Sequence, residues 1–254
     1  MRVLVCIKRV PMTGGTIVLT EDRRAIETRH LGFTISPHEE CGVEEAVRLI
    51  EAGGGSSTVL TLGPPEAEEQ LRDCMALGID RAIHLLADDE FDGQATARAI
   101  VEAIEAERAA GTEYDVVFFG NESADAGGFQ VGIRVAHALG RPCVTGVKAV
   151  ALEDGGLRLE QEVPGGRDVY RVPLPAVVTV KEGLNLPRYP SVPGRLRAKK
   201  KPLETRTPER GAQGVEKVRL VVPADEGSQT EVLGRGPDAA PAVVELLERI
   251  GVVG

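Results

Sequence analysis

The sequence predicts an α/β fold, a three-layer parallel sheet with an antiparallel flap and a C-terminal arm. Short apolar runs alternate with segments of helical periodicity over residues 1–140. This alternation is typical of a parallel sheet covered by helices on both faces. Three segments of alternating polarity follow, separated by glycine pairs at 155–156 and 165–166, and they indicate hairpins. Residues 201–237 then lose clear periodicity, which indicates an extended arm.

The parallel strands are expected in five apolar runs rich in β-branched residues, namely Val3–Ile7, Ser57–Leu62, Arg81–Leu86, Asp115–Phe119 and Ala176–Val180. Helices are expected between them, at 37–53, Pro65–Leu77, Gln94–Ala110 and Phe129–Leu139. The first helix has the clearest start, because Ser36 precedes Pro37 and Glu39 follows three residues after Ser36. This spacing is a capping box.

The flap is expected to consist of the segments Val147–Leu152, Gly156–Val163 and Arg167–Val172. We therefore divide the chain into residues 1–200, an α/β domain, and residues 201–254, an arm. The arm regains helical spacing only at Ala239–Ile250. An extended arm that ends in a helix is easiest to explain if it packs on another protein.

Composition excludes several classes of protein. The formal net charge of −9 argues against nucleic-acid binding, since that affinity depends on neutralising phosphates, and with 3% aromatic residues base stacking is not expected. The four cysteines form no C-x-x-C pair, so we expect reduced thiols and a cytoplasmic location. No apolar run is long enough to span a membrane, and the first one is too short for a signal peptide.

Catalytic and metal-binding patterns are not found. The four histidines have no metal-ligand spacing, and there is no G-x-S-x-G nucleophile elbow. We therefore predict no catalytic residue and no metal site, and the chain is not expected to be an enzyme. His38 is the histidine of interest, because it sits at a predicted helix start beside the sheet edge.

The segment VVFFGNESADAGGFQVGIRVAHALG, residues 116–140, carries most information about function. A buried strand leads through a glycine-containing loop into a helix, and ligands gather at the carboxyl ends of such strands. Free N–H groups at the helix start attract phosphate, while Ser123, Asp125 and Gln130 could bond ribose or adenine. Alternatively, the glycines could serve only to connect the strand tightly to the helix. Lys8 and Arg9 could contact a phosphate or be surface charges. Neither a dinucleotide fingerprint nor a Walker loop is present.

A second feature is a loop stiffened by Pro187, Pro190 and Pro193, followed by a basic run at 195–201. A short basic run in an acidic protein is usually a solvated face. Rigid loops with an exposed apolar tip can also dock another protein. The docking residues predicted here are Pro190, Ser191, Val192, Pro193 and Gly194.

Five ordered segments together resemble the β subunit of electron-transfer flavoproteins. They are RVLVCIKRVP, SPHEECGVEEAVRL, ALGIDRAIHL, LEQEVPGGRDVYRVPLPAVVTV and LNLPRYPSVPGRLRAKKKPLE, spread over residues 2–205. The resemblance implies a Rossmann-like domain of the adenine-nucleotide-binding type that pairs with an α subunit. It implies FAD shared with that subunit and AMP bound in this chain. It also implies a role in electron transport, from acyl-CoA or related dehydrogenases of fatty acid oxidation to a membrane-linked, quinone-reducing acceptor.

Site residues follow from the resemblance position by position, with Lys8 added from its place at the end of the first strand. The expected cofactor-binding residues are Cys6, Lys8, Ser36, Pro37, His38, Glu39, Leu62, Asp125, Ala126, Gly127, Gly128, Phe129, Gln130, Val131, Gly132, Ile133, Arg134, Val135 and Ala136. Val192 takes the place of an apolar docking anchor, and Glu162 matches a carboxylate that contacts the flavin domain.

Departures from the family pattern leave two rival functions open. Residues 125–132 keep Gln130, Val131 and Gly132 but lack an Asp-Thr pair, so the site could hold FAD in place of AMP. The chain would then belong to a flavin-bifurcating, NADH-oxidising protein. A free-standing nucleotide-sensing protein of the universal-stress type shares the same α/β layout, but the basic loop and the long arm argue against it.

Overall fold

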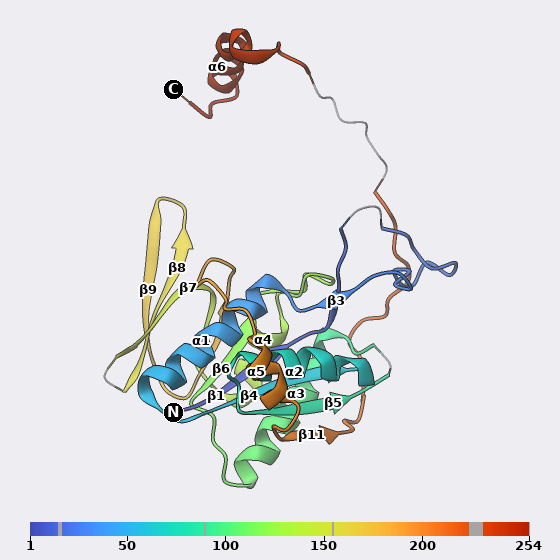
Figure 1. Cartoon of the computed structure of the whole chain (residues 1–254), viewed down its shortest axis with the longest axis vertical. Helices are drawn as coiled ribbons and strands as arrows, with labels where there is room; N and C mark the ends of the chain where they lie inside the picture. Colours follow the sequence, from blue (N-terminus) through green and yellow to red (C-terminus); the bar gives the residue numbers. More distant parts are fainter. Residues whose placement is uncertain (15–16, 89, 154, 224–230, 254) are drawn as a thin grey trace. The chain divides into compact units, whose positions relative to one another are not determined.

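The computed structural model describes the chain except for residues 15–16, 89, 154, 224–230 and 254 (Figure 1). It divides into two compact units, Met1–Val218 and Arg219–Gly254. Among the described residues, no helix is both long and apolar enough to cross a membrane. The first unit contains the sheet and the candidate site.

A nine-stranded sheet forms the centre of the first unit, in the order β11-β5-β4-β1-β6-β10-β7-β8-β9. Its strands are β1 (Arg2–Ile7), β4 (Ser56–Gly63), β5 (Arg81–Leu86), β6 (Val116–Gly120), β7 (Cys143–Glu153), β8 (Gly156–Val163), β9 (Gly166–Pro173), β10 (Ala176–Val180) and β11 (Leu203–Arg206). The strands from β11 to β7 pair in parallel. The α/β fold class is therefore confirmed.

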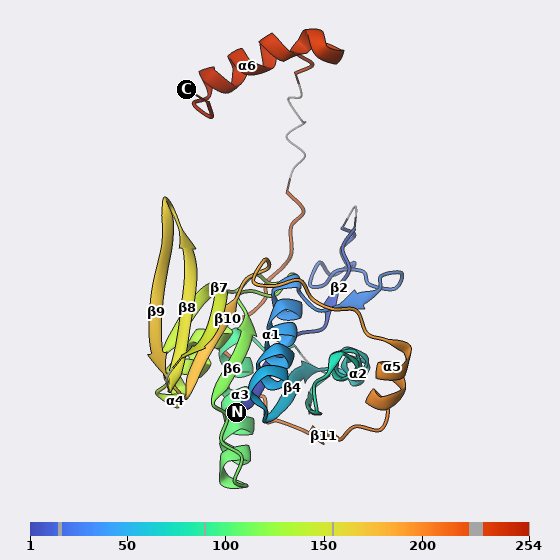
Figure 2. The same ribbon diagram turned by 60° about the vertical axis from the view of Figure 1, so that its left-hand side comes forward.

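Helices cover both faces of this sheet (Figure 2). They are α1 (Pro37–Gly53), α2 (Glu68–Leu77) with the preceding 3-10 turn η1 (Pro65–Ala67), α3 (Gly93–Ala109) and α4 (Val131–Leu139). Side chains alternate along β1, so Val3 and Val5 join the core under α1 and α2, whereas Leu4 joins the core under α3 and α4. Both faces of the central strands are buried, as expected for parallel strands with continuous apolar runs.

The antiparallel flap is confirmed as β7, β8 and β9. The strand β7 is longer than predicted because its first residues pair in parallel with β10 before the rest pairs with β8. The change of partner coincides with a register irregularity and with Gly146, whose φ of 62° is the left-handed region that favours glycine. One proposed turn residue at the tip, position 154, lies outside the described residues.

Three features of the first unit, two of them after residue 180, were not predicted from the sequence. Helix α5 (Val192–Ala198) occupies part of the expected stiff loop, because Ser191 caps it and proline is compatible with its first turn. Strand β11 pairs with β5, so the first unit continues past residue 200, where we had placed the domain boundary. The short pair β2 (Val10–Pro11) and β3 (Phe33–Thr34) lies outside the main sheet.

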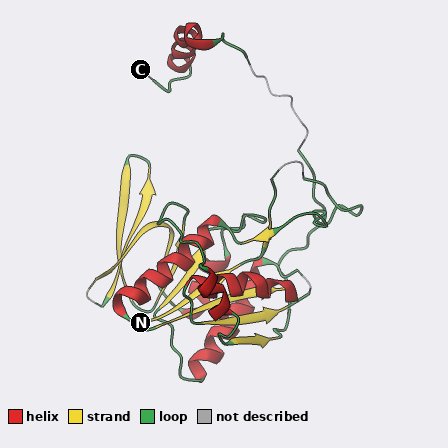
Figure 3. Ribbon diagram, viewed as in Figure 1, coloured by secondary structure: helices red, strands yellow, loops and turns green. Residues whose placement is uncertain are grey.

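The second unit contains the turn η2 (Gly236–Ala239) and helix α6 (Ala240–Arg249), which confirms the predicted terminal helix (Figure 3). None of the described residues in α6 is buried. Val243 and Val244 are exposed, and Leu246 and Leu247 are half-buried. The unit therefore does not bury its own apolar face.

Candidate functional site

The strand order reverses between β1 and β6, and the region beyond the carboxyl ends of these two strands is here called the crevice. The two strands are neighbours, but β1 leads through α1 to β4 on one side, whereas β6 leads through α4 to β7 on the other. Such a reversal of direction is the point at which open α/β sheets bind ligands. The loops after Ile7 and Gly120, and the first turns of α1 and α4, surround it.

The start of α1 is fixed by the predicted capping box. The Ser36 hydroxyl accepts the backbone N–H of His38, and the Glu39 carboxylate accepts the backbone N–H of Ser36 at 3.0 Å. The Ser36 hydroxyl also donates to the carbonyl of Glu122, which follows β6. The box therefore connects α1 to the loop after β6.

Glu39 is an acidic group buried at the base of the crevice. Its residue is 5% exposed, and a Cβ at Gly120 would lie 2.7 Å from its Cγ. Burial raises the pKa of Glu39 to about 8, against the opposing effect of N–H groups from Ser36 and Lys8. A neutral or weakly ionised carboxyl can therefore face a ligand here near neutral pH.

Lys8 and Asp125 form an ion pair across the crevice, with 2.7 Å between Nζ and Oδ2. Partial burial raises the pKa of Asp125, but the charge and hydrogen bond of Lys8 outweigh it and lower the pKa overall. The pair neutralises Lys8, the first of two cations after β1, and the second, Arg9, lies over the Phe33 ring at 3.3 Å from its centroid. A phosphate in the crevice therefore has to find most of its positive partners elsewhere.

The N-terminus of α4 provides such partners. Gln130 stands at its N-cap but makes no side-chain hydrogen bond to the first turn, whereas Ser36 caps α1 and Asp92 caps α3. The first helical bond runs from the Arg134 N–H to the Gln130 carbonyl. Among the described residues, the backbone N–H groups of 128–133 have no acceptor. Free amides at a helix start are a ready site for an anion.

Side chains around this helix start hold its geometry. The Gln130 Oε1 accepts a bond from Arg134 Nε at 2.8 Å, and a Cβ at Gly93 would lie 2.9 Å from Gln130 Cδ. Helical side chains point toward the N-terminus, so Arg134 reaches back to the free amides. Gly132 packs so closely on β10 that a Cβ would lie 2.8 Å from Thr179 Cγ2.

The loop that precedes α4 contains two residues in the left-handed region. Gly127 has a φ of 53° and Phe129 a φ of 52°. The value is ordinary for glycine but uncommon for phenylalanine, whose side chain is 54% exposed. Strained backbone of this kind clusters at ligand sites.

The structure brings many of the predicted nucleotide residues to one edge. Those that surround the crevice or its loops are Lys8, Ser36, Pro37, His38, Glu39, Asp125, Ala126, Gly127, Gly128, Phe129, Gln130, Val131, Gly132, Ile133 and Arg134. Leu62 lies two strands from β6, near the end of β4. Cys6, Val135 and Ala136 are buried in the core under α3 and α4.

A cavity of about 390 Å³ lies on the flap side of the same edge. His38 forms part of its wall, and its Nδ1 accepts the backbone N–H of Glu182 at 2.7 Å. The other ring nitrogen, Nε2, therefore carries the hydrogen and donates to Glu122, 3.1 Å away. Glu162 also lines the cavity and pairs with Lys148 at 2.9 Å.

Sequence reasoning did not identify Asn121 and Thr179, which join the strand ends at this cavity. The Asn121 Oδ1 accepts bonds from the Gly146 N–H and the Thr179 hydroxyl, and its Nδ2 donates to Glu122. Two features of the sequence could have identified them: Asn121 is a polar residue directly after a buried strand, and Thr179 is a lone threonine within the apolar run AVVTV.

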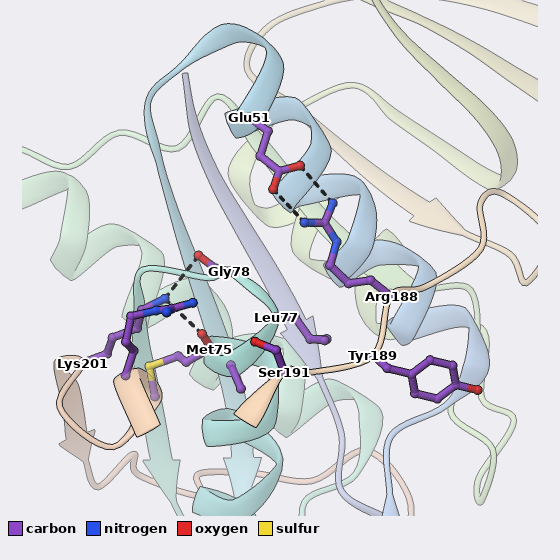
Figure 4. A pocket seen from close by; sticks show the side chains of 10 residues that line it. Glu51, Met75, Leu77, Gly78, Arg188, Tyr189, Ser191 and Lys201 are labelled. Carbon is purple, nitrogen blue, oxygen red and sulfur yellow. Dashed lines mark hydrogen bonds and ion pairs between the residues drawn. The ribbon is translucent and has the colours of Figure 1, made fainter. Parts of the chain in front are cut away.

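The predicted docking residues lie beside another cavity, of about 310 Å³, between α1, α2 and α5. Figure 4 shows Arg188 facing Glu51 and Lys201 reaching the carbonyls of Met75 and Gly78. Val192 is 73% exposed in the first turn of α5. Ser191 caps that turn, and Gly194 is buried against α2, where a Cβ would lie 2.5 Å from the Ala76 carbonyl oxygen.

Comparisons with known proteins show the family of this chain. Residues 25–210 match the electron transfer flavoprotein domain family. The electron transfer flavoprotein subunit beta of Bacillus subtilis is 35% identical over 192 residues, 73% of each chain. The human protein of that name is 34% identical over 257 residues, 99% of this chain and 98% of its own. The mitochondrial one of Oryza sativa subsp. indica is 34% identical over 210 residues, 82% of this chain and 83% of its own. The chain therefore belongs to the β-subunit family of electron transfer flavoproteins.

Proposed function

We propose that this chain is the β subunit of a heterodimeric electron shuttle. The shuttle takes electrons from dehydrogenases, among them acyl-CoA dehydrogenases of fatty acid oxidation, and passes them to a membrane-linked, quinone-reducing acceptor. Membership of the family supports the role of electron carrier rather than enzyme. In this proposal the protein works in the cytoplasm, and the chain itself supplies a nucleotide site, a docking segment and an arm.

The nucleotide is proposed to be AMP, bound in the crevice between β1 and β6. The observation that carries this assignment is the uncapped N-terminus of α4, whose free amides suit a phosphate. Arg134 adds a guanidinium at the same end of the helix, where a cation is unfavourable unless an anion is present. The buried carboxyl of Glu39 lies at the other side and suits a hydroxyl or amino donor of the nucleoside.

The flavin is proposed to be FAD, held mainly by the α subunit and facing the cavity beside His38. That cavity, about 390 Å³, is at the small end of the usual range of about 300–1,000 Å³, which suits a site completed by a second subunit. When bound, the flavin would supply the one-electron chemistry. This chain would supply the Nε2–H and carboxylate of the His38–Glu122 pair and the Glu162–Lys148 pair, as polar walls that exclude water.

Docking of the donor dehydrogenase is proposed at residues 190–194. Val192 is exposed at the start of α5, which is held against α2 by an ion pair between Arg195 and Asp73 at 2.8 Å. An exposed apolar side chain on a rigid support loses little entropy when it binds. The part of the arm beyond the first unit, residues 219–254, is proposed to pack the apolar face of α6 on the α subunit.

Nucleotide release tests the proposal. The purified heterodimer would be denatured, and the released nucleotides separated by chromatography and quantified against protein. One FAD and one AMP per heterodimer would support the proposal. Two FAD would instead assign the chain to a flavin-bifurcating, NADH-oxidising protein, and a folded chain that co-purifies with no flavin partner would overturn both assignments.

A further inference from the structure

Residues 207–218, here called the strap, connect the end of β11 to the second unit. They contain no helix or strand, and every residue in them is described. They cross the first turn of α3, where side chains of the main unit hold their backbone. Arg98 donates to the carbonyls of Arg210 and Ala212, and the Glu90 carbonyl accepts bonds from Arg210 and Gln213.

Asp92 is the central holding group. Its Oδ1 accepts the Ala95 N–H at 2.7 Å and thereby caps α3. Its Oδ2 accepts the backbone N–H groups of Gly214 and Val215, the latter at 3.0 Å. Burial raises the pKa of Asp92, but the backbone bonds together outweigh it and lower the pKa overall. One carboxylate therefore serves both the helix and the strap.

Two glycines of the strap lie beside side chains of α3. A Cβ at Gly211 would lie 2.2 Å from Arg98 Nη2, and a Cβ at Gly214 would lie 2.9 Å from Gln94 Oε1, but both of these atoms end flexible side chains that can move aside. The firmer constraint is the backbone of Gly211, whose φ of 58° lies in the left-handed region that favours glycine.

The contacts that hold the strap are polar. Val215 is 71% exposed and Val218 is 75% exposed, so apolar burial contributes little. Lys217 adds an ion pair with Glu90, and Glu216 pairs with Arg24 at 3.5 Å. A segment held in this way can be released without opening a hydrophobic core.

We propose that Asp92 is a latch that orders the root of the C-terminal arm before the partner subunit binds. This inference rests on the proposed role of residues 219–254 in partner binding. An arm whose first residues are already ordered loses less conformational entropy on association than a free one. The latch therefore strengthens the heterodimer without touching the partner.

The test uses two variants of the full heterodimer that release the strap from opposite sides. Asp92→Ser keeps a hydroxyl that caps α3 but removes the oxygen that holds the strap. Gly214→Pro removes one strap N–H and leaves Asp92 intact. Asp73→Ser, at an acidic residue of α2 with an exposed side chain, is the control, because the Asp73 carboxylate pairs with Arg195 of α5 and not with the strap.

Two measurements are made, amide hydrogen exchange of the strap and the dissociation constant of the heterodimer. Both variants are expected to accelerate exchange of the Val215 amide about tenfold and to weaken the heterodimer on the order of fivefold, while the control changes neither. Unchanged strap exchange, or faster exchange with an unchanged dissociation constant, overturns the latch. A chain truncated after residue 218 that binds the partner as tightly as the full chain instead overturns the proposed role of the arm.

Discussion

Replacement of Glu39 by glutamine should stabilise the protein increasingly as the pH rises. Glu39 is buried, and burial raises its pKa from the usual value of 4.5 to about 8. The folded state therefore binds a proton that the unfolded state releases above pH 4.5. A raised carboxyl pKa contributes stability that is fully present below the unfolded value and is lost as pH rises through the folded value.

The size of the effect follows from the same pKa. Each pH unit above 4.5, up to about 8, removes about 1.4 kcal/mol from the free energy of unfolding, so about 3 kcal/mol is lost by pH 7. Glutamine has no proton to lose and keeps an oxygen for the Ser36 N–H. Glu39→Gln should therefore equal the wild type near pH 4.5 and exceed it by about 3 kcal/mol at pH 7.

The assay is urea denaturation of the heterodimer at fixed concentration, in steps from pH 5 to pH 8, with AMP absent and present. Glu69→Gln, an exposed glutamate on α2, is the matched control and should show no pH-dependent difference. A difference between Glu39→Gln and wild type that is constant with pH, or that shrinks as pH rises, would refute the argument from burial.

Three further predictions concern binding. Gly132→Ala places a Cβ 2.8 Å from Thr179 Cγ2 and must shift the start of α4. The affinity for AMP, measured by calorimetry, should therefore fall about tenfold or more. An unchanged affinity would exclude a phosphate at this helix start. Arg134→Met should weaken AMP about tenfold and leave adenosine unaffected, because only the phosphate meets the guanidinium; equal losses for both would contradict this role. Val192→Glu should slow flavin reduction by an acyl-CoA dehydrogenase about tenfold while the flavin content stays unchanged. Val18→Glu, at another exposed valine, is the control and should not slow it. A Val192→Glu rate equal to that of the wild type would reject the docking role.

The sequence predicted the C-terminal part of the chain less well than the central sheet. Loss of periodicity after residue 200 predicted an extended segment, but β11 and the strap belong to the first unit. The four residues of β11 alternate too briefly to be distinguished from a loop, and they form a strand because β5 offers an open edge. Helix α5 was not predicted for a related reason. Its seven residues include Pro193 and follow two further prolines, so they show little helical periodicity of their own.

Sequence alone determined the elements whose cause is local. Apolar runs predicted the central strands, the spacing of Ser36 and Glu39 predicted the start of α1, and the glycine loop after VVFF indicated where the proposed nucleotide site lies. These follow from propensity, capping and periodicity, which act over a few residues.

Tertiary structure alone decided the contacts between distant parts of the chain. It placed a buried carboxyl at Glu39, paired Lys8 with Asp125, and brought Asp92 to the strap, 122 residues away in sequence. No local pattern encodes these contacts, because burial and charge pairing depend on which segments the sheet order brings together. The strand order, which reverses between β1 and β6, therefore determines where the candidate site lies.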